Sequence, residues 1–112
     1  MCSSDLLLAT HAPQRIAIAG DSAGGGLTLA LLVALRDAGA PLPAAAAPIS
    51  PWVDLTQSGG SMRTKADVDP MVTEAGLARM AAWYLDGRDA TDAIASPLFA
   101  ALEGLPIGRA HV

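Results

Sequence analysis

A serine between glycines, set between a strand-like run and a helix-like run, constrains this chain more than any other feature. The apolar run Ile16–Ala19 leads to Ser22, and an apolar run rich in helix formers, Leu27–Leu35, follows it. Turning a strand into a helix within one residue forces that residue into a sparsely populated backbone region. Its neighbours two positions before and after must then lack bulk, and Gly20 and Gly24 occupy those positions. The sequence therefore predicts a strand, an abrupt turn and a helix, with a hydroxyl at the turn.

This turn has the G-x-S-x-G pattern of a nucleophile elbow, which holds a serine Oγ above the carboxyl edge of a parallel sheet. Its five residues are Gly20, Asp21, Ser22, Ala23 and Gly24. The alternative is that Ser22 is a plain N-cap that accepts hydrogen bonds from the first-turn amides. Gly25 and Gly26 follow Gly24 directly, and each glycine inside a helix costs about 1 kcal/mol relative to alanine. A cap does not need these glycines, whereas a close approach of the helix to neighbouring backbone does, so the pattern favours a nucleophile.

A second strand and a second helix are expected further along. Ala44–Ser50 would complete a β-α-β unit with parallel strands. Its alanines have weak β-propensity, and Pro48 lacks the amide that a central strand uses, so Pro48 either ends the strand or makes it irregular. The helix is expected over residues 73–85, with Thr73 as its cap. Its apolar stripe is expected to pack in the core rather than to line a substrate pocket, and consists of Leu77, Met80 and Tyr84.

Trp52 and Asp54 follow the second strand directly. The carboxyl ends of strands in open α/β sheets are the ligand side, so both residues are candidates for the substrate side of a site. Each has an alternative: Trp52 can be core packing, and Asp54 can orient backbone near the site. Three further carboxylates, Asp86, Asp89 and Asp92, lack the spacing of a metal-binding loop and are expected to be solvated or capping groups.

Six short motifs occur in a fixed order: GDSAGG, SPWVDLT, DP, YLDG, ASPLFA and LEGLP. Together they resemble the hormone-sensitive-lipase-like (family IV) branch of the α/β-hydrolases, over about Arg15 to Pro106. The resemblance implies a central β-α-β fragment of an α/β-hydrolase sheet, comprising the elbow strand, a helix, the next parallel strand and a further helix. It also implies hydrolysis of small-molecule carboxylic esters through an acyl-enzyme on Ser22, without a metal or cofactor.

The resemblance further implies where the other catalytic groups lie. The backbone N–H of Ala23, next to the nucleophile, would be one oxyanion donor, and an upstream H-G-G-G loop would supply others. The triad acid and histidine would follow Ser22 in that order, with the acid beyond Pro106, so Asp54 is expected to be structural. His11 precedes Ser22 and is not expected to be the base. The chain alone is therefore expected to be inactive.

Apart from ester hydrolysis, the sequence leaves two functions open and excludes several others. A serine peptidase with G-D-S-G-G lies in an all-β setting and does not fit the helix over Leu27–Leu35. Neither G-x-x-x-x-G-K-[ST] nor a G-x-G-x-x-G that opens the helix is present, so phosphate and dinucleotide loops are excluded. An acyltransferase of the same fold and a non-catalytic binding relative both remain open.

Composition agrees with one globular α/β unit. The chain has 112 residues, of which 52% are hydrophobic and 16% are charged. The net charge is −4 and the seven basic residues are scattered, so no basic face for nucleic acid is expected. No apolar run reaches the roughly 20 residues of a membrane span. Residues 1–10 lack the basic start of a secretory signal, and a cytoplasmic location is expected. The oligomeric state is not set by these features.

The two ends of the chain can be read as each other's antisense. The codons GTG TGC TCT TCC GAT for Met1 to Asp5 have a reverse complement that encodes Ile107 to His111. The DNA string resembles a common sequencing-library adapter. We therefore expect residues 1–6 and 107–112 to be adapter-derived, and 7–106 to be the genuine part of a partial α/β-hydrolase domain. Cys2 and His111 are then not functional candidates. Genomic DNA that encodes both end peptides would refute the adapter origin of the two ends.

Overall fold

The computed structural model describes residues 3–106. Along the chain lie α1 (Ser3–Thr10), the 3-10 turn η1 (Pro13–Arg15), β1 (Ala17–Asp21), α2 (Ala23–Asp37), β2 (Ala45–Ile49), α3 (Ser61–Thr64), α4 (Glu74–Leu85) and the 3-10 turn η2 (Pro97–Phe99). Within this described part, no helix combines the length and the apolar character needed to cross a membrane. Met1, Cys2 and residues 107–112, which belong to the two suspected ends, lie outside the described residues.

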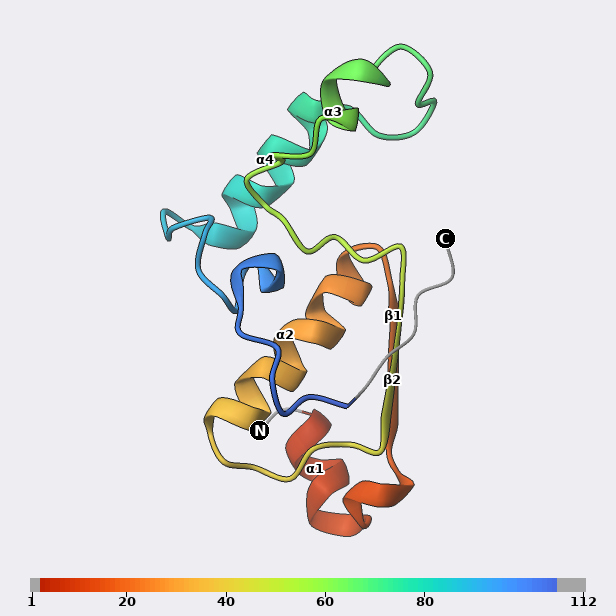
Figure 1. The fold of residues 1–112 in the computed structure, drawn as a ribbon, viewed down its shortest axis with the longest axis vertical. Coiled ribbons are helices and arrows are strands. Elements are labelled where there is room, and N and C mark those ends of the chain that lie inside the picture. Colours follow the sequence, from red (N-terminus) through yellow and green to blue (C-terminus); the bar gives the residue numbers. More distant parts are fainter. Residues whose placement is uncertain (1–2, 107–112) are drawn as a thin grey trace.

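The two strands are parallel, and α2 packs against both of them. Their register runs from Ala17 opposite Ala45 to Asp21 opposite Ile49. Figure 1 shows α2 running back alongside the strands, with α1 near their amino ends and α4 extending beyond their carboxyl ends. The predicted β-α-β unit and the α/β class are confirmed. β1 begins one residue and ends two residues later than predicted, and β2 is one residue shorter at each end than its predicted run. The helix starts at Ala23, directly after Ser22.

Pro48 lies inside β2, opposite Gly20, so it does not mark the end of the strand. The Ile49 carbonyl accepts a hydrogen bond from the Ser22 amide, so the polar backbone groups of Ile49 face β1. Successive residues in a strand alternate, so the backbone nitrogen of Pro48 faces the opposite edge. Its missing N–H therefore removes no bond between β1 and β2.

Helix α2 is buried on the side that faces the sheet and open elsewhere. Val33 is 1% exposed, whereas Leu27 is 54% exposed. The helix ends at the Ala38 cap, and Gly39 follows with φ 65°, the left-handed conformation that glycine adopts without strain. The Ala40 amide then bonds the Leu35 carbonyl over 2.9 Å. Gly39 is therefore the C′ residue of α2.

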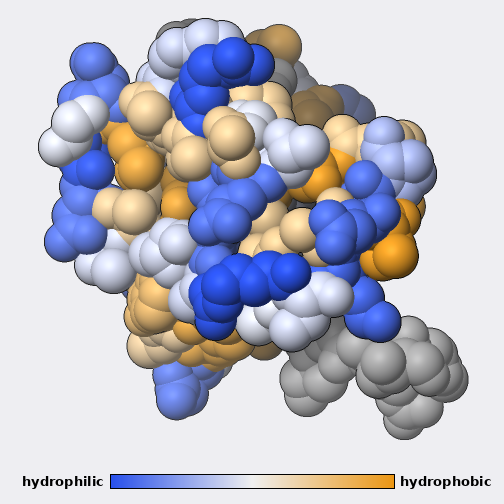
Figure 2. Space-filling model, turned by 90° about the horizontal axis from the view of Figure 1, so that it is seen from above, coloured by the Kyte–Doolittle hydropathy of each residue, from blue (hydrophilic) through white to orange (hydrophobic). Residues whose placement is uncertain are grey.

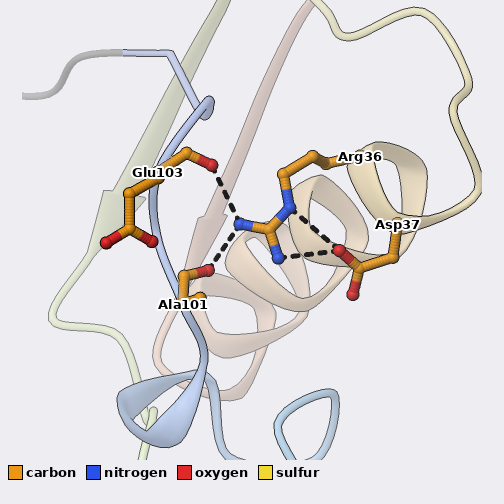
Figure 3. Close-up of polar contacts among 4 residues, drawn as sticks. All are labelled: Arg36, Asp37, Ala101 and Glu103. Carbon is orange, nitrogen blue, oxygen red and sulfur yellow. Dashed lines mark hydrogen bonds and ion pairs between the residues drawn. The ribbon is translucent and has the colours of Figure 1, made fainter.

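Arg36, in the last turn of α2, ties the helix to the C-terminal segment (Figure 3). Its Nη1 donates hydrogen bonds to the backbone carbonyls of Ala101 and Glu103, and Nη2 pairs with the Asp37 carboxylate over 2.7 Å. One guanidinium carries five donors in a fixed plane, so it can join two segments that are far apart in sequence. The segment after η2 thus lies against the end of α2.

Helix α4 begins and ends as predicted but packs through a different stripe. The Thr73 Oγ1 accepts a hydrogen bond from the Gly76 amide, and Asp86 ends the helix with φ 47°. The buried side chains are Ala81 and Leu85, whereas Met80 and Tyr84 are each 46% exposed. The predicted core stripe through Met80 and Tyr84 is therefore wrong. Ala81 is small enough to let the helix approach closely, and this directs the face with Leu85 toward Leu55.

The surface at the α3–α4 end carries apolar side chains among polar ones. Figure 2 views the molecule from this end and shows orange, apolar groups between blue ones. Three of the most exposed large apolar residues come from this part of the chain: Val68, Met71 and Trp83. Arg79 lies over the Trp83 ring, 5.6 Å from its centroid.

Candidate active site

Ser22 has a strained backbone that three hydrogen bonds hold in place. Its φ is 55° and its ψ is −115°, a region that non-glycine residues rarely adopt. The Ser22 amide donates to the Ile49 carbonyl over 3.0 Å. The Ser22 carbonyl accepts from the Gly26 amide at 3.1 Å and from the Trp52 amide at 2.9 Å. Strain of this kind persists only where the surroundings over-determine it, and here β2 and its exit supply two of the three bonds.

The side chain of Ser22 is exposed and makes no capping hydrogen bond to α2. The plain N-cap alternative is therefore wrong for this serine. The amide of Ala23 is the first of the helix, and an α-helix offers its first amides no acceptor of its own. A hydroxyl and the first amide of α2 consequently lie side by side at the carboxyl end of β1.

Glycine is required at three positions around Ser22, and Gly24, which was also expected to need it, is not one of them. A Cβ on Gly20 would overlap the Gly24 carbonyl and lie 2.8 Å from Thr28 Oγ1. A Cβ on Gly25 would lie 2.9 Å from Pro51 Cβ, and one on Gly26 would overlap the Trp52 carbonyl. A Cβ on Gly24 would meet open space, so the expectation that Gly24 must lack bulk is wrong.

The asymmetry has a simple geometric cause. The side-chain direction of Gly20 points at the first turn of α2, whereas that of Gly24 points away from the strand. Gly26 belongs to the run of three glycines from which the sequence analysis predicted a close approach. The close approach is confirmed, and it joins α2 to the segment that leaves β2.

A cavity of about 200 Å³ opens next to Ser22. It is almost entirely apolar and lies between the first turns of α2, the exit of β2 and α4. Its walls include Ala23, Gly26, Trp52, Leu55, Met80 and Tyr84. Met80 and Tyr84 therefore line a cavity beside the elbow, contrary to the expectation that their stripe only packs. Their side chains are exposed because they border this open cavity.

Trp52 both packs in the core and borders the cavity. Its ring packs against the cluster of Leu55, Ala81 and Leu85, and it also lines the cavity. The indole Nε1 donates to the Asp54 carbonyl over 3.0 Å, which satisfies the polar end of the ring. Core packing and a wall beside the elbow are thus not alternatives for this residue.

Asp54 directs its carboxylate into its own loop. Oδ1 accepts from the amide and hydroxyl of Thr56, and Oδ2 accepts from the amide and hydroxyl of Ser58. Partial burial pushes the pKa of Asp54 upward, but the hydrogen bonds from Thr56 and Ser58 outweigh it and hold the pKa below its usual value. A carboxylate that accepts four such bonds suits the structural role expected for Asp54.

His11 lies at the wrong end of the strand to meet Ser22. It precedes the amino end of β1, and its Nδ1 is 2.8 Å from Thr10 Oγ1. Ser22 follows the carboxyl end, and five residues at a rise of about 3.3 Å each separate the two ends by roughly 16 Å. His11 is the only histidine among residues 3–106, so none of the described residues offers Ser22 an imidazole base.

The acidic residues after α4 cap turns. Asp89 accepts from the amide and hydroxyl of Thr91, and Asp92 accepts from the amides of Ile94 and Ala95. Within residues 3–106, no group of three or more His, Cys, Asp and Glu side chains could hold a metal ion. The capping role expected for these carboxylates is confirmed for Asp89 and Asp92.

Ser96 is a structural residue that the sequence analysis did not single out. It is fully buried, and its Oγ accepts a hydrogen bond from the Leu55 amide over 2.9 Å. Two residues further along from Ser96, the Leu98 amide donates to the Val53 carbonyl over 3.1 Å. These bonds hold the segment around η2 against the exit of β2. A serine between apolar residues in ASPLFA was the only local signal for this role.

Comparison with known proteins gives consistent matches. The profile of the family described as alpha/beta hydrolase fold matches residues 5–111. An acetyl-hydrolase of Streptomyces hygroscopicus is 52% identical over 94 residues, which are 84% of this chain and 31% of that protein. An esterase of Acinetobacter venetianus is 35% identical over 102 residues, which are 90% of this chain and 34% of that protein.

Solved structures agree in fold as well as in sequence. A crystal structure of an esterase from the bacterial hormone-sensitive lipase family is 50% identical, with a TM-score of 0.88 over 93% of this chain and 35% of that chain. A crystal structure of an esterase/lipase from an uncultured bacterium is 52% identical, with a TM-score of 0.86 and the same coverage. This chain thus spans about a third of the length of the relatives it matches.

Proposed function

Because this chain belongs to the α/β-hydrolase fold family, we propose that the full-length protein hydrolyses carboxylic esters with Ser22 as its nucleophile. One observation carries the proposal: an exposed serine side chain on a strained backbone that hydrogen bonds from both neighbouring elements maintain. Backbone strain of this size is concentrated at functional sites. The relatives described as acetyl-hydrolase and esterase support ester hydrolysis as the reaction class.

The chemistry follows from the position of Ser22. A serine hydroxyl is a weak nucleophile until a base removes its proton. The Oγ would attack the ester carbonyl carbon and form a tetrahedral intermediate, and the alcohol would leave with the proton that the base holds. Water would then attack the acyl-enzyme and release the acid. The resemblance implies a histidine base oriented by an aspartate, both from segments other than residues 3–106.

The amide of Ala23 is the proposed oxyanion donor from this segment. The negative charge forms on the carbonyl oxygen as Ser22 attacks, and donors that are already oriented stabilise it without reorganisation. The Ala23 N–H is adjacent to the nucleophile and lies at the positive end of the α2 dipole. Further donors are expected from the H-G-G-G loop of the full-length protein.

The cavity beside Ser22 is proposed to hold the apolar part of the ester. Its walls are nearly all apolar, so a charged group placed there would lose its hydration without gaining a partner. Apolar acyl or alcohol groups would instead gain from burial, by about 25 cal/mol per Å² of apolar surface. The substrates proposed are therefore uncharged esters of small to medium size.

Replacement of the nucleophile tests this function. In the full-length protein, Ser22→Ala is expected to lower kcat for 4-nitrophenyl butyrate about 10⁶-fold, the loss typical of a serine hydrolase without its nucleophile. Ser61→Ala, at an exposed serine of α3, is the matched control and should leave kcat unchanged. Turnover by Ser22→Ala within tenfold of the unaltered protein would refute the assignment. Mass spectrometry after phosphonofluoridate treatment should find the label on Ser22 alone.

A further inference from the structure

Two contacts join helix α4 to the loop that follows β2. Its C-terminal half packs through Ala81 and Leu85 on Leu55. Figure 1 shows that the N-terminal half extends away from β1, β2 and α2. The placement of that half therefore depends on the loop that follows β2, which runs beside it.

Gln57, in this loop, provides the second attachment. The groups around its carboxamide fix the orientation: the nitrogen donates to the Glu74 carbonyl over 3.1 Å, and the oxygen accepts from the Ala78 amide over 3.0 Å. Glu74 and Ala78 are one helical turn apart. A single side chain thus bonds both a carbonyl and an amide of α4, which defines its distance and its rotation relative to the loop.

The loop presents Gln57 in a strained conformation, with φ 56°. Its two neighbours, Thr56 and Ser58, are the residues that donate to the Asp54 carboxylate through both amide and hydroxyl. The Gln57 amide also bonds the Asp54 carbonyl over 3.3 Å. The Asp54 carboxylate therefore holds the residues on both sides of Gln57, and this maintains the left-handed backbone that aims the carboxamide at α4.

The same helix supplies Met80 and Tyr84 to the cavity beside the elbow. A helix is a rigid element, so a shift of its N-terminal half moves Met80 and changes the width of the cavity. We propose that Gln57 is a positioning residue for substrate selection: its carboxamide fixes α4 on the loop after β2 and thereby sets how long an acyl group the cavity accepts. This inference rests on the proposed ester hydrolysis.

Two substitutions in the full-length protein separate the side chain from the backbone. Gln57→Ala removes the carboxamide, and Gln57→Gly removes it while relieving the positive φ. Gln57→Glu keeps the acceptor for the Ala78 amide but cannot donate to the Glu74 carbonyl. Its chain-length preference should therefore lie between those of Gln57→Ala and the unaltered protein. Gln14→Ala, at an exposed glutamine of η1, is the matched control.

The measured quantity is the ratio of kcat/KM for 4-nitrophenyl hexanoate to that for 4-nitrophenyl acetate. We expect this ratio to change about tenfold in Gln57→Ala and Gln57→Gly, the effect of losing one or two hydrogen bonds that hold the wall. The change should come from KM of the longer ester rather than from kcat. Hydrogen exchange of the amides in the N-terminal half of α4 should become faster in both variants and stay unchanged in Gln14→Ala.

Each negative result refutes a different claim. An unchanged chain-length ratio in both variants overturns the role of Gln57 in selection, whatever happens to the exchange rate. Unchanged exchange of all amides in the N-terminal half of α4 overturns the attachment itself. If the unaltered protein hydrolyses no ester, the proposed function fails, and the exchange rate still decides whether Gln57 fixes α4.

Discussion

Ser22 occupies a backbone conformation that costs about 1–3 kcal/mol, and its neighbours maintain it. The Ile49 carbonyl and the Trp52 amide both come from β2 and its exit. The elbow is therefore not a property of the pentapeptide alone. Gly26 matters as much as Ser22 in this respect, because it lets α2 approach the Trp52 carbonyl closely.

A pair of glycine substitutions tests this close approach. Gly26→Ala in the full-length protein is expected to lower the free energy of unfolding by about 1–3 kcal/mol, because its Cβ would overlap the Trp52 carbonyl. Gly24→Ala, only two residues away, meets open space and should be neutral or stabilising by up to about 1 kcal/mol. Denaturant titration measures both, and equal effects of the two substitutions would contradict the packing described.

At the scale of elements, the loop after β2 connects the elbow with α4. Trp52 bonds the elbow, Asp54 holds the loop and Gln57 reaches the helix. Ser96 joins the same loop from the C-terminal side. This short loop therefore contacts the elbow, helix α4 and the segment around Ser96, which meet at the cavity.

The loop should respond to acid through Asp54. The pKa of Asp54 is lowered in the folded protein, so its stabilising contribution is present above the unfolded value of about 3.9. It is lost as the pH falls through the lowered folded pKa. Asp54→Asn should therefore reduce the free energy of unfolding at pH 7, and the difference from the unaltered protein should shrink toward pH 3.

Denaturant titrations at pH 7 and pH 3 provide the measurement. Asp37→Asn serves as a control because the Asp37 carboxylate pairs with Arg36 on the other side of the molecule. A deficit in Asp54→Asn that is equally large at pH 3 and pH 7 would show that the carboxylate does not hold the loop through its charge.

At the scale of the whole molecule, apolar surface remains open on the described chain. Met71 is 87% exposed, and Val68 and Trp83 are each 71% exposed. A parallel sheet of two strands also needs cover on both faces and neighbours at its edges. The relatives are about three times as long, and the proposed base and further oxyanion donors are expected from the rest of such a protein.

The 112-residue chain expressed alone is therefore expected to behave as a molten or aggregating species without Ser22-dependent turnover. Exposed apolar surface binds hydrophobic dyes and lowers cooperativity. Dye binding and a thermal scan measure this. A soluble monomer with a sharp thermal transition would contradict the prediction, and so would ester hydrolysis that Ser22→Ala abolishes.

Local features of the fold could be predicted because their causes are local. The run of three glycines, the strand before it and the helix formers after it identified the elbow, and Thr73 marked the start of α4. The capping carboxylates Asp89 and Asp92 were also predictable, because a turn is formed by residues close in sequence.

The sequence by itself determined the two strands, the helix between them, the helix α4, the order of these four elements and the candidate nucleophile, because backbone strain and periodicity depend on neighbouring residues. Only the tertiary structure decided which glycines meet another backbone, which face of α4 is buried, and that Met80 and Tyr84 border a cavity. The attachment of Gln57 to α4 was likewise beyond the sequence. These contacts join residues distant along the chain, and their geometry exists only once β2, its loop and both helices are packed together.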